Sequence, residues 1–341
     1  MLKKLFKLII TAAIIFGCIW LWKEIRENAA AECTPWTGGS ATAYTDEEKA
    51  LKAVSFSTLA YGCESIADPE GTVSALISSK NMGIISENAE IARTDESDAS
   101  TARINTADYI KLTAGESRFI TELKNEKNGF YGAAFADDAA KVVWIAYSGA
   151  VSFTDVFQAA GMIAAPALTG QEECAFELYE KVIQKPEIET YGYSLVLTGH
   201  SLGGGLAAMV AHLSGCEAVT VNGLDGAALT KLKAIENADP SGGRIVNMLA
   251  KPGRARFTIK DIVQRFLLAD KSGDIERHVF EENGMTENSH CAFAIIEFAS
   301  GDPAKPKLPD SEVSTDKKLP HINKDTIEKV DDAISALSEE G

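Results

Sequence analysis

A serine between two glycines, in the segment Gly199-His200-Ser201-Leu202-Gly203, is the pattern in the sequence that points most directly to chemistry. A serine hydroxyl is a weak nucleophile, and it needs exposure and a neighbouring base before it can attack a carbonyl carbon. A sharp turn between a strand and a helix gives that exposure, and it crowds the flanking positions so that glycine is favoured there. The spacing therefore predicts a nucleophile elbow with Ser201 at its tip.

The residues on either side of the elbow fit this prediction. The apolar run 194–198 predicts a buried strand, and the Ala/Gly-rich run 202–213 predicts a helix behind the serine. The N-terminus of that helix would favour negative charge developing beside Ser201. A glycine-rich turn with an ordinary serine is the alternative, and the strand and helix around it argue against that interpretation.

Apolar strand patterns alternate with helical patterns along most of the chain. We expect strands at 129–135, 141–147, 194–198, 218–222 and 244–250, and helices at 47–61, 107–123, 171–184 and 202–213. Thr45 and Glu48 form a predicted capping box at the start of the first helix. Short helices and loops are expected over 64–105. This alternation predicts an α/β fold, with a mostly parallel central sheet and helices on both faces.

The elbow resembles that of the class-3 (fungal lipase-like) family of α/β hydrolases. Residues 56–61 are similar to the first helix of that family. The segments 132–135 and 142–150 are similar to a strand pair of the family that ends in the oxyanion loop. The resemblance covers about residues 50–298 and is nearest to a bacterial lipase-like branch. It implies the α/β-hydrolase fold.

The resemblance also implies a Ser-Asp-His triad and an oxyanion hole. The backbone N–H groups of Leu202 and Ala150 are the implied oxyanion donors. Asp261, in the turn Lys260-Asp261-Ile262-Val263, is the implied acid. Asp225 is the alternative acid, because it too follows a predicted strand.

His290, in a loop before an apolar stretch, is the implied catalytic base. Among the other histidines, His200 is too close to Ser201 to act as its base, and His212 is expected to pack within its helix. His321 lies in the polar tail, which leaves His278 as the alternative base.

Two positions depart from the family pattern. Ser148 stands where the family usually has arginine, and Ala150 stands where it has a hydroxyl residue. A backbone donor survives these changes, whereas a side-chain donor to the oxyanion does not. We therefore predict a serine ester hydrolase of the lipase, esterase or phospholipase kind, acting on a small-molecule or lipid ester. A pseudo-hydrolase that binds an acyl or envelope ligand is one alternative, and an acyltransferase or peptidase with the same triad is another. No metal or organic cofactor is implied.

The segment 151–169 is unusually apolar for a loop. In the resembled family this region forms a lid or a wall of the acyl pocket, which suits a lipid or acyl ester. An ordinary core helix explains the same composition equally well.

The N-terminal segment 1–31 predicts export. Three lysines precede the apolar run 8–22, which is short for a spanning helix, and the small residues at 29–31 offer a cleavage site. The segment is therefore either a signal peptide or an N-terminal membrane anchor, and we expect the chain in the cell envelope or secreted. The formal net charge of −16 argues against nucleic acid as a partner, and we interpret it as favouring solubility.

The remaining boundaries follow from composition. We expect one α/β-hydrolase domain over 32–300, followed by a Pro- and charge-rich linker and a C-terminal helix over 301–341. Export would allow a disulfide between Cys33 and Cys63. Cys216 and Cys291 are expected to be buried thiols.

Overall fold

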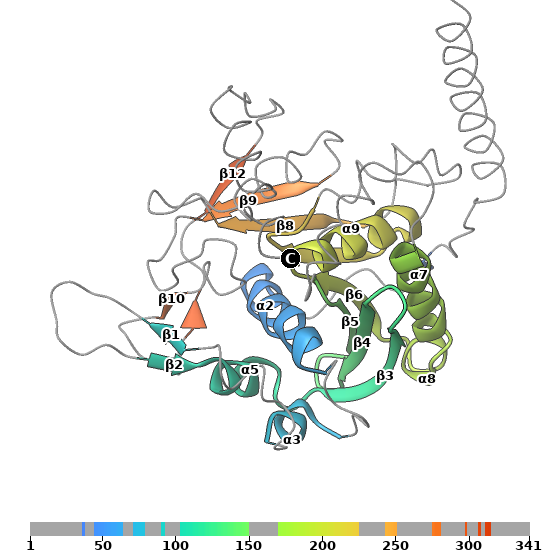
Figure 1. Ribbon diagram of the computed structural model, residues 1–341, viewed down its shortest axis with the longest axis horizontal. Helices are drawn as coiled ribbons and strands as arrows, with labels where there is room; N and C mark the ends of the chain where they lie inside the picture. Colours follow the sequence, from blue (N-terminus) through green and yellow to red (C-terminus); the bar gives the residue numbers. More distant parts are fainter. Residues whose placement is uncertain are drawn as a thin grey trace, which may run out of the picture.

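An eight-stranded β-sheet forms the centre of the computed structural model (Figure 1). Its strands are β3 (Arg118–Asn125), β4 (Phe130–Asp137), β5 (Val142–Tyr147), β6 (Ser194–Gly199), β7 (Glu217–Val221), β8 (Ile245–Ala250), β9 (Glu276–Phe280) and β12 (Ser311–Ser314). Their order across the sheet is β12-β9-β8-β7-β6-β5-β4-β3. Strands β5 to β9 pair in parallel, whereas β3, β4 and β12 pair antiparallel at the two sides. The predicted mostly parallel sheet is confirmed.

The structure describes residues 36–37, 44–63, 71–78, 90–92, 103–149, 170–224, 243–250, 275–280, 297–298, 306–307 and 311–314. The predicted N-terminal segment 1–31, the apolar segment 151–169 and the C-terminal helix at 324–337 lie outside these residues. Among the helices of the described ranges, none is long and apolar enough to cross a bilayer.

Strand β5 shows why the central strands are continuously apolar. All six of its residues are buried, and successive side chains enter opposite layers of the molecule. Trp144 packs in one layer, while Val143 and Ile145 pack in the other. A strand covered on both faces has no solvent side, so polar alternation is absent. Burying each aliphatic side chain of this size stabilises the fold by about 1.5–3 kcal/mol.

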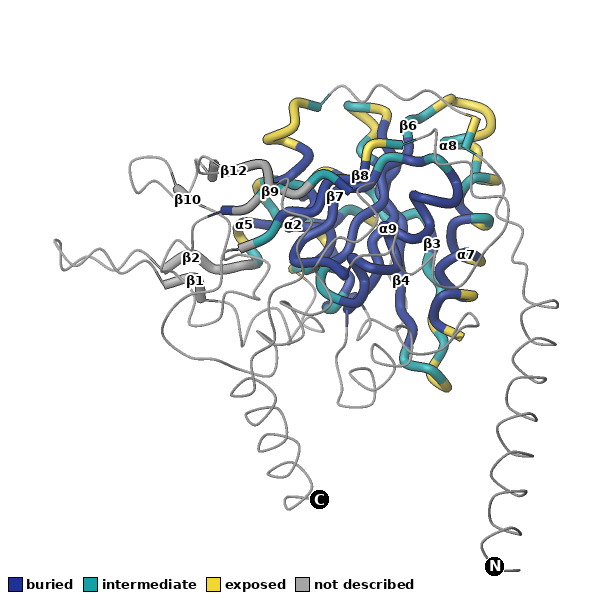
Figure 2. Tube along the Cα trace, turned by 90° about the horizontal axis from the view of Figure 1, so that it is seen from above, coloured by how far each residue is buried: buried dark blue, intermediate teal, exposed yellow. Residues whose placement is uncertain are grey.

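Helices cover both faces of the sheet, as predicted. One layer contains α2 (Asp46–Cys63), α3 (Val73–Ser78) and α5 (Thr106–Ala114). The other contains α7 (Gly170–Ile183), α8 (Pro186–Glu189) and α9 (Leu202–Ser214). Figure 2 shows the buried residues concentrated in the central strands and in α9.

The capping box at the start of α2 is confirmed. The Thr45 N–H donates to Glu48 Oε2 at 2.8 Å, and the Glu48 N–H donates to Thr45 Oγ1 at 3.2 Å. These bonds satisfy N–H groups that the first helical turn leaves without a partner. They also lower the pKa of the Glu48 carboxyl.

The predicted helix over residues 107–123 is wrong in its second half. Helix α5 ends at Ala114 and β3 begins at Arg118. At the turn between them, a Cβ on Gly115 would lie only 2.2 Å from the Lys111 carbonyl oxygen. β3 then pairs along its whole length with β4, with a register shift between Phe119 and Thr121. This long-range pairing outweighs the local helical pattern.

The sheet also continues beyond the predicted domain end at residue 300. Residues 311–314, which we expected in a linker, form β12 and pair with residues 277–280 of β9. Two smaller ribbons lie outside the main sheet. They are β1 (Glu90–Ala92) with β2 (Arg103–Asn105), where only helices and loops were expected, and β10 (Glu297–Phe298) with β11 (Pro306–Lys307).

The N-terminal arm contacts both layers at one end of the sheet. The Trp36 N–H donates to the carbonyl of Ser214, the last residue of α9, at 2.7 Å. Tyr44 packs against Trp144 in the α2 layer, and its hydroxyl donates to Asp137. The arm is therefore fixed at the end where the parallel strands begin.

The described cysteines are buried free thiols. Burial raises the pKa of both Cys63 and Cys216 to about 12. The prediction for Cys216 is confirmed. Cys63 does not form the predicted disulfide, because its side chain points into the core below α2. Cys33 and Cys291 lie outside the described residues.

Candidate active site

Ser201 stands at a sharp turn between β6 and α9. β6 ends at Gly199 and α9 begins at Leu202. Ser201 has φ 57° and ψ −120°, and a strained backbone of this kind costs about 1–3 kcal/mol. Ser201 is partly exposed, while Leu202 and Gly203 behind it are buried. The strand-turn-helix context predicted for the elbow is confirmed.

The two glycines of the motif let α9 approach the sheet. A Cβ at Gly199 would lie 2.3 Å from the carbonyl oxygen of Gly203. A Cβ at Gly203 would lie 2.1 Å from the carbonyl oxygen of Tyr147, the last residue of β5. Each clash would be with main chain rather than with a mobile side chain. Both positions therefore require a residue without a Cβ while the elbow keeps this shape.

A second close contact fixes the helix behind the serine. A Cβ at Gly204 would lie 2.6 Å from the Cα of Gly223, in the loop that follows β7. Gly223 is held in turn by the side chain of Asn247 from β8. Its N–H donates to Asn247 Oδ1 at 3.0 Å, and Asn247 Nδ2 donates to its carbonyl at 2.8 Å. Asn247 is only 2% exposed, so these bonds satisfy an amide that would otherwise be costly to bury.

Main-chain hydrogen bonds join the elbow to the neighbouring strand ends. The Ser201 N–H donates to the Val221 carbonyl at 3.1 Å, and the Ser201 carbonyl accepts from the Leu224 N–H at 3.2 Å. Asn222, with φ 45°, donates its N–H to the Met248 carbonyl at 2.8 Å. The carboxyl ends of β6, β7 and β8 thus form one hydrogen-bonded edge, with Ser201 on it.

Tyr61, in the last turn of α2, contacts both the elbow and the loop after β5. Its hydroxyl shares a hydrogen bond with His200 Nδ1 at 2.9 Å. A Cβ on Gly149 would lie 1.9 Å from the same hydroxyl and 2.6 Å from the His200 carbonyl oxygen. Gly149 is therefore packed tightly between Tyr61 and His200.

The two predicted oxyanion donors follow closely on the residues that Tyr61 contacts: Ala150 comes after Gly149, and Leu202 is two residues after His200. Leu202 is the first residue of α9, so its N–H belongs to the turn that has no acceptor within the helix. Ala150 lies one residue beyond the described part of the loop. The loop itself is anchored by Ser148, whose N–H donates to the Tyr131 carbonyl at 3.0 Å. The buried Ser148 hydroxyl donates to the Gly149 carbonyl at 3.2 Å.

The described histidines are engaged elsewhere. His200 bonds to Tyr61, and His212 is buried in α9, as predicted. His278, the alternative base, bonds to Glu276 at 2.6 Å beside the N-terminal end of α2. Tyr61, which contacts the elbow, lies about 22 Å further along that helix at 1.5 Å per residue. His290, Asp261 and Asp225 lie outside the described residues.

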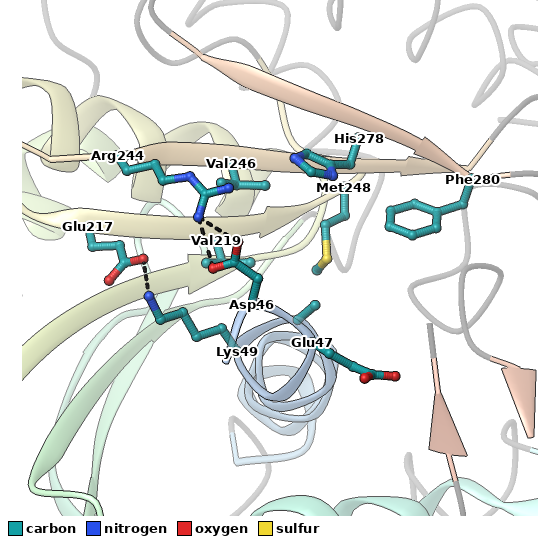
Figure 3. Close-up of a pocket in the computed structure, with 11 residues that line it drawn as sticks. Asp46, Glu47, Lys49, Glu217, Val219, Arg244, Val246, Met248, His278 and Phe280 are labelled. Carbon is teal, nitrogen blue, oxygen red and sulfur yellow. Dashed lines mark hydrogen bonds and ion pairs between the residues drawn. The ribbon is translucent and has the colours of Figure 1, made fainter. Parts of the chain in front are cut away.

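A pocket lies at the opposite end of α2 from the elbow (Figure 3). Its volume is about 120 Å³, and apolar side chains of β7, β8 and β9 form part of its lining. Arg244 bonds both carboxylate oxygens of Asp46 at 2.8 Å and also bonds Glu276 at 2.9 and 3.0 Å. Lys49 pairs with Glu217 at 2.6 Å. The bonds from Arg244, opposed by burial, lower the pKa of Glu276 to about 2.

Within the described ranges, no group of three or more His, Cys, Asp or Glu side chains is arranged to hold a metal ion.

A family model described as "Phospholipase-like: Tle-like phospholipase domain" matches residues 82–248, which include the elbow. The predicted resemblance to a lipase-like family is confirmed. The bacterial branch within it remains a prediction. Strand order and elbow geometry together give the chain the α/β-hydrolase fold.

Several solved fungal lipases are similar in structure. Lipase II from Rhizopus niveus has 16% identity and a TM-score of 0.36, with 61% of this chain and 76% of that chain covered. The lipase from Rhizopus microsporus var. chinensis has 15% identity and a TM-score of 0.41, with 85% and 86% covered. The triacylglyceride lipase of Rhizomucor miehei has 13% identity and a TM-score of 0.33, with 56% and 80% covered. No curated protein matches the sequence.

Sequence reasoning missed two residues, Asn247 and Tyr61, that contact the elbow or the loop packed against it. Asn247 could have been found, because it is a polar residue inside the apolar strand run 245–250. The bond between Tyr61 and His200 joins positions 139 residues apart. No local sequence pattern predicts a hydrogen bond between residues so far apart in the chain.

Proposed function

We propose that this chain is a serine carboxylic ester hydrolase with Ser201 as its nucleophile. The strained backbone of Ser201 between β6 and α9 carries the proposal. A main chain held at φ 57° by close glycine contacts is a cost without benefit in an ordinary turn. It has a use where a hydroxyl must stand clear of the sheet and meet a substrate.

His290 is the proposed base and Asp261 the proposed acid. β7, β8 and β9 run parallel to β6, so the segments that follow them start from the edge that carries Ser201. Asp261 follows the end of β8 by eleven residues, and His290 follows the end of β9 by ten. Ten residues can span up to about 33 Å, which is ample to return to the elbow. His200 is bonded to Tyr61 and His278 to Glu276, and these interactions also favour His290 as the base.

The reaction follows from these roles. His290 takes the proton of the Ser201 hydroxyl as its oxygen attacks the ester carbonyl carbon. The N–H groups of Leu202 and Ala150 stabilise the oxyanion, and Asp261 stabilises the imidazolium. His290 then protonates the departing alcohol, and water releases the acyl group from Ser201.

A lipid ester is the proposed substrate, and a phospholipid is the first one to test. The family model that matches residues 82–248 is described as a phospholipase domain, which supports this choice. The apolar segment 151–169, directly after the oxyanion loop, would suit an acyl chain.

An activity-based probe tests the nucleophile. We expect wild type to be labelled by a fluorophosphonate and to hydrolyse p-nitrophenyl esters of graded chain length, then phosphatidylcholine vesicles. Ser201→Ala should lose labelling and at least about a thousandfold in kcat. Ser78→Ala, which removes an exposed hydroxyl on α3, is the matched control and should behave as wild type. Equal hydrolysis by wild type and Ser201→Ala would refute the assignment.

One observation favours a binding protein without turnover as the second candidate. Ser148 turns its hydroxyl toward its own loop, and Ala150 has no hydroxyl to offer an oxyanion. A folded wild type that resists the probe as completely as Ser201→Ala would favour this candidate. Product formation that depends on an added alcohol or amine acceptor would instead indicate acyl transfer.

A further inference from the structure

Three segments that are distant in sequence meet at the hydroxyl of Tyr61. This oxygen lies in the last turn of α2, bonds the ring of His200 in the elbow at 2.9 Å, and packs against Gly149 in the loop after β5. The two rings are 5.9 Å apart between centroids, tilted by 58°. The arrangement fixes the ring of His200 against the end of α2.

Each segment that Tyr61 contacts continues into a proposed oxyanion donor. Ala150 is bonded directly to Gly149, and Leu202 lies two residues after His200. Ser148 anchors the start of the oxyanion loop on β4 through its N–H bond to Tyr131. The Tyr61 hydroxyl provides a contact on the elbow side, one residue before the donor. It therefore contacts both segments that lead to the proposed donors.

We propose that Tyr61 is a positioning residue of the oxyanion hole, acting through its hydrogen bond to His200 and its contact with Gly149. The inference rests on the proposed hydrolase function. An oxyanion hole works when its donors lie 2.7–3.1 Å from the oxyanion, so a shift of a few tenths of an ångström weakens it. Loss of the Tyr61 hydroxyl removes the contact that holds His200 and Gly149 against the same oxygen.

A purely structural role makes a different prediction. Tyr61 is partly exposed, so its hydroxyl is not a core group. Tyr109 offers the matched control, because its hydroxyl also bonds α2, donating to the Leu51 carbonyl at 3.0 Å from a buried ring. Tyr109→Phe should lower Tm and leave kcat within twofold of wild type. Tyr61→Phe should do the reverse.

The experiment measures kcat, KM, the probe-labelling rate and Tm. The proteins compared are wild type, Tyr61→Phe, Tyr109→Phe, His200→Ala, His200→Asn and the Tyr61→Phe/His200→Ala double variant. We expect Tyr61→Phe to lower kcat and labelling rate about tenfold, with KM within twofold and Tm within about 2 °C. Tyr61→Phe should slow His200→Ala by a smaller factor than it slows wild type, because the two changes share the Tyr61–His200 bond and only the Gly149 contact is left to lose. His200→Asn, which keeps a hydrogen-bonding group near Nδ1, should recover part of the loss.

The possible failures are distinguishable. If wild type is labelled at Ser201 and Tyr61→Phe has an unchanged kcat, the positioning role is wrong and the proposed hydrolase function is retained. A Tyr61→Phe that loses kcat and Tm together, as an unfolded fraction would, also overturns it. A folded wild type that neither labels nor hydrolyses any ester overturns both the proposed function and the role of Tyr61.

Discussion

Helix α2 meets the elbow at one end and the charged pocket at the other, and the two ends are held by different interactions. At the elbow, main chain touches main chain at Gly199, Gly203 and Gly204, and a neutral hydrogen bond joins Tyr61 to His200. At the pocket, the contacts are ion pairs between side chains (Figure 3). The pairs of Arg244 with Asp46 and Glu276 are partly exposed, whereas the pair of Lys49 with Glu217 is nearly buried.

The difference shows where this molecule requires precision. Backbone contacts cannot relax without moving a strand or a helix, so the elbow tolerates little change. Partly exposed ion pairs exchange one solvated arrangement for another at low cost. We therefore expect substitutions at the two ends to differ both in size and in whether they affect catalysis.

The largest effect is expected for Gly203→Ala. The added Cβ would lie 2.1 Å from the Tyr147 carbonyl oxygen, so the elbow must open or α9 must move away from the sheet. We expect a loss of about 3 kcal/mol or more in the free energy of unfolding, with no probe labelling. Denaturant unfolding and the fluorophosphonate assay measure the two effects.

Gly192→Ala is the control for this change. Gly192 has φ +67° but nothing within 4 Å of an added Cβ, so only the backbone penalty of about 1 kcal/mol applies. A Gly203→Ala protein as stable and as reactive as Gly192→Ala would show that close packing does not set the elbow.

An intermediate effect is expected for Asn247→Ala. The change removes both bonds to Gly223 and leaves its buried N–H and carbonyl unsatisfied, at a cost of about 2–4 kcal/mol. Because Gly223 packs on Gly204, kcat should fall as well. Asn125→Ala, at a turn beside α7, should cost less than about 1 kcal/mol and leave kcat unchanged. If both variants retain wild-type kcat, the Asn247 clamp does not support the elbow.

The smallest effect is expected at the pocket, from Glu276→Gln. The pKa of Glu276 in the folded protein is about 2, below its ordinary value, so its ionised form stabilises the fold. That stabilisation is complete above about pH 4.5 and is lost as the pH falls toward 2. It is worth about 1 kcal/mol or less, because the side chain is partly exposed and screened by solvent.

Thermal unfolding of wild type and Glu276→Gln across pH 2–7 checks this prediction. Wild type should be the more stable protein at pH 7 by a few degrees in Tm, and the two curves should converge near pH 2. Activity should be the same in both. A difference in Tm that persists unchanged to pH 2 would mean that the Glu276 charge is not its source.

Local patterns predict the elements that carry the elbow, because each is defined by its own neighbours. Apolar runs identify β5, β6 and β8, the Thr45–Glu48 box marks the start of α2, and glycine spacing locates the turn at Ser201. The same reasoning fails at β3, where pairing with β4 overrides a helical pattern. It fails again at β12, a short strand that exists only because β9 offers it an edge.

The contacts that position the site depend even more on tertiary structure. Asn247 and Gly223 are brought together by the end of β7, and Tyr61 reaches His200 only after α2 has packed along the sheet. Ser201 could be proposed from its local sequence. The residues that hold its surroundings could not, since their partners are defined by the fold.

The attachment of the N-terminal arm has a consequence for how the molecule faces its surroundings. Trp36 is bonded to the last residue of α9, about 18 Å along that helix from the elbow. Trp36, the first residue that the structure describes, therefore lies at the end of α9 remote from Ser201. Of the two roles predicted for the N-terminal segment, a signal peptide would leave the protein free, whereas an anchor at residues 8–22 would attach it on the side away from Ser201, so that the active site would face the aqueous phase.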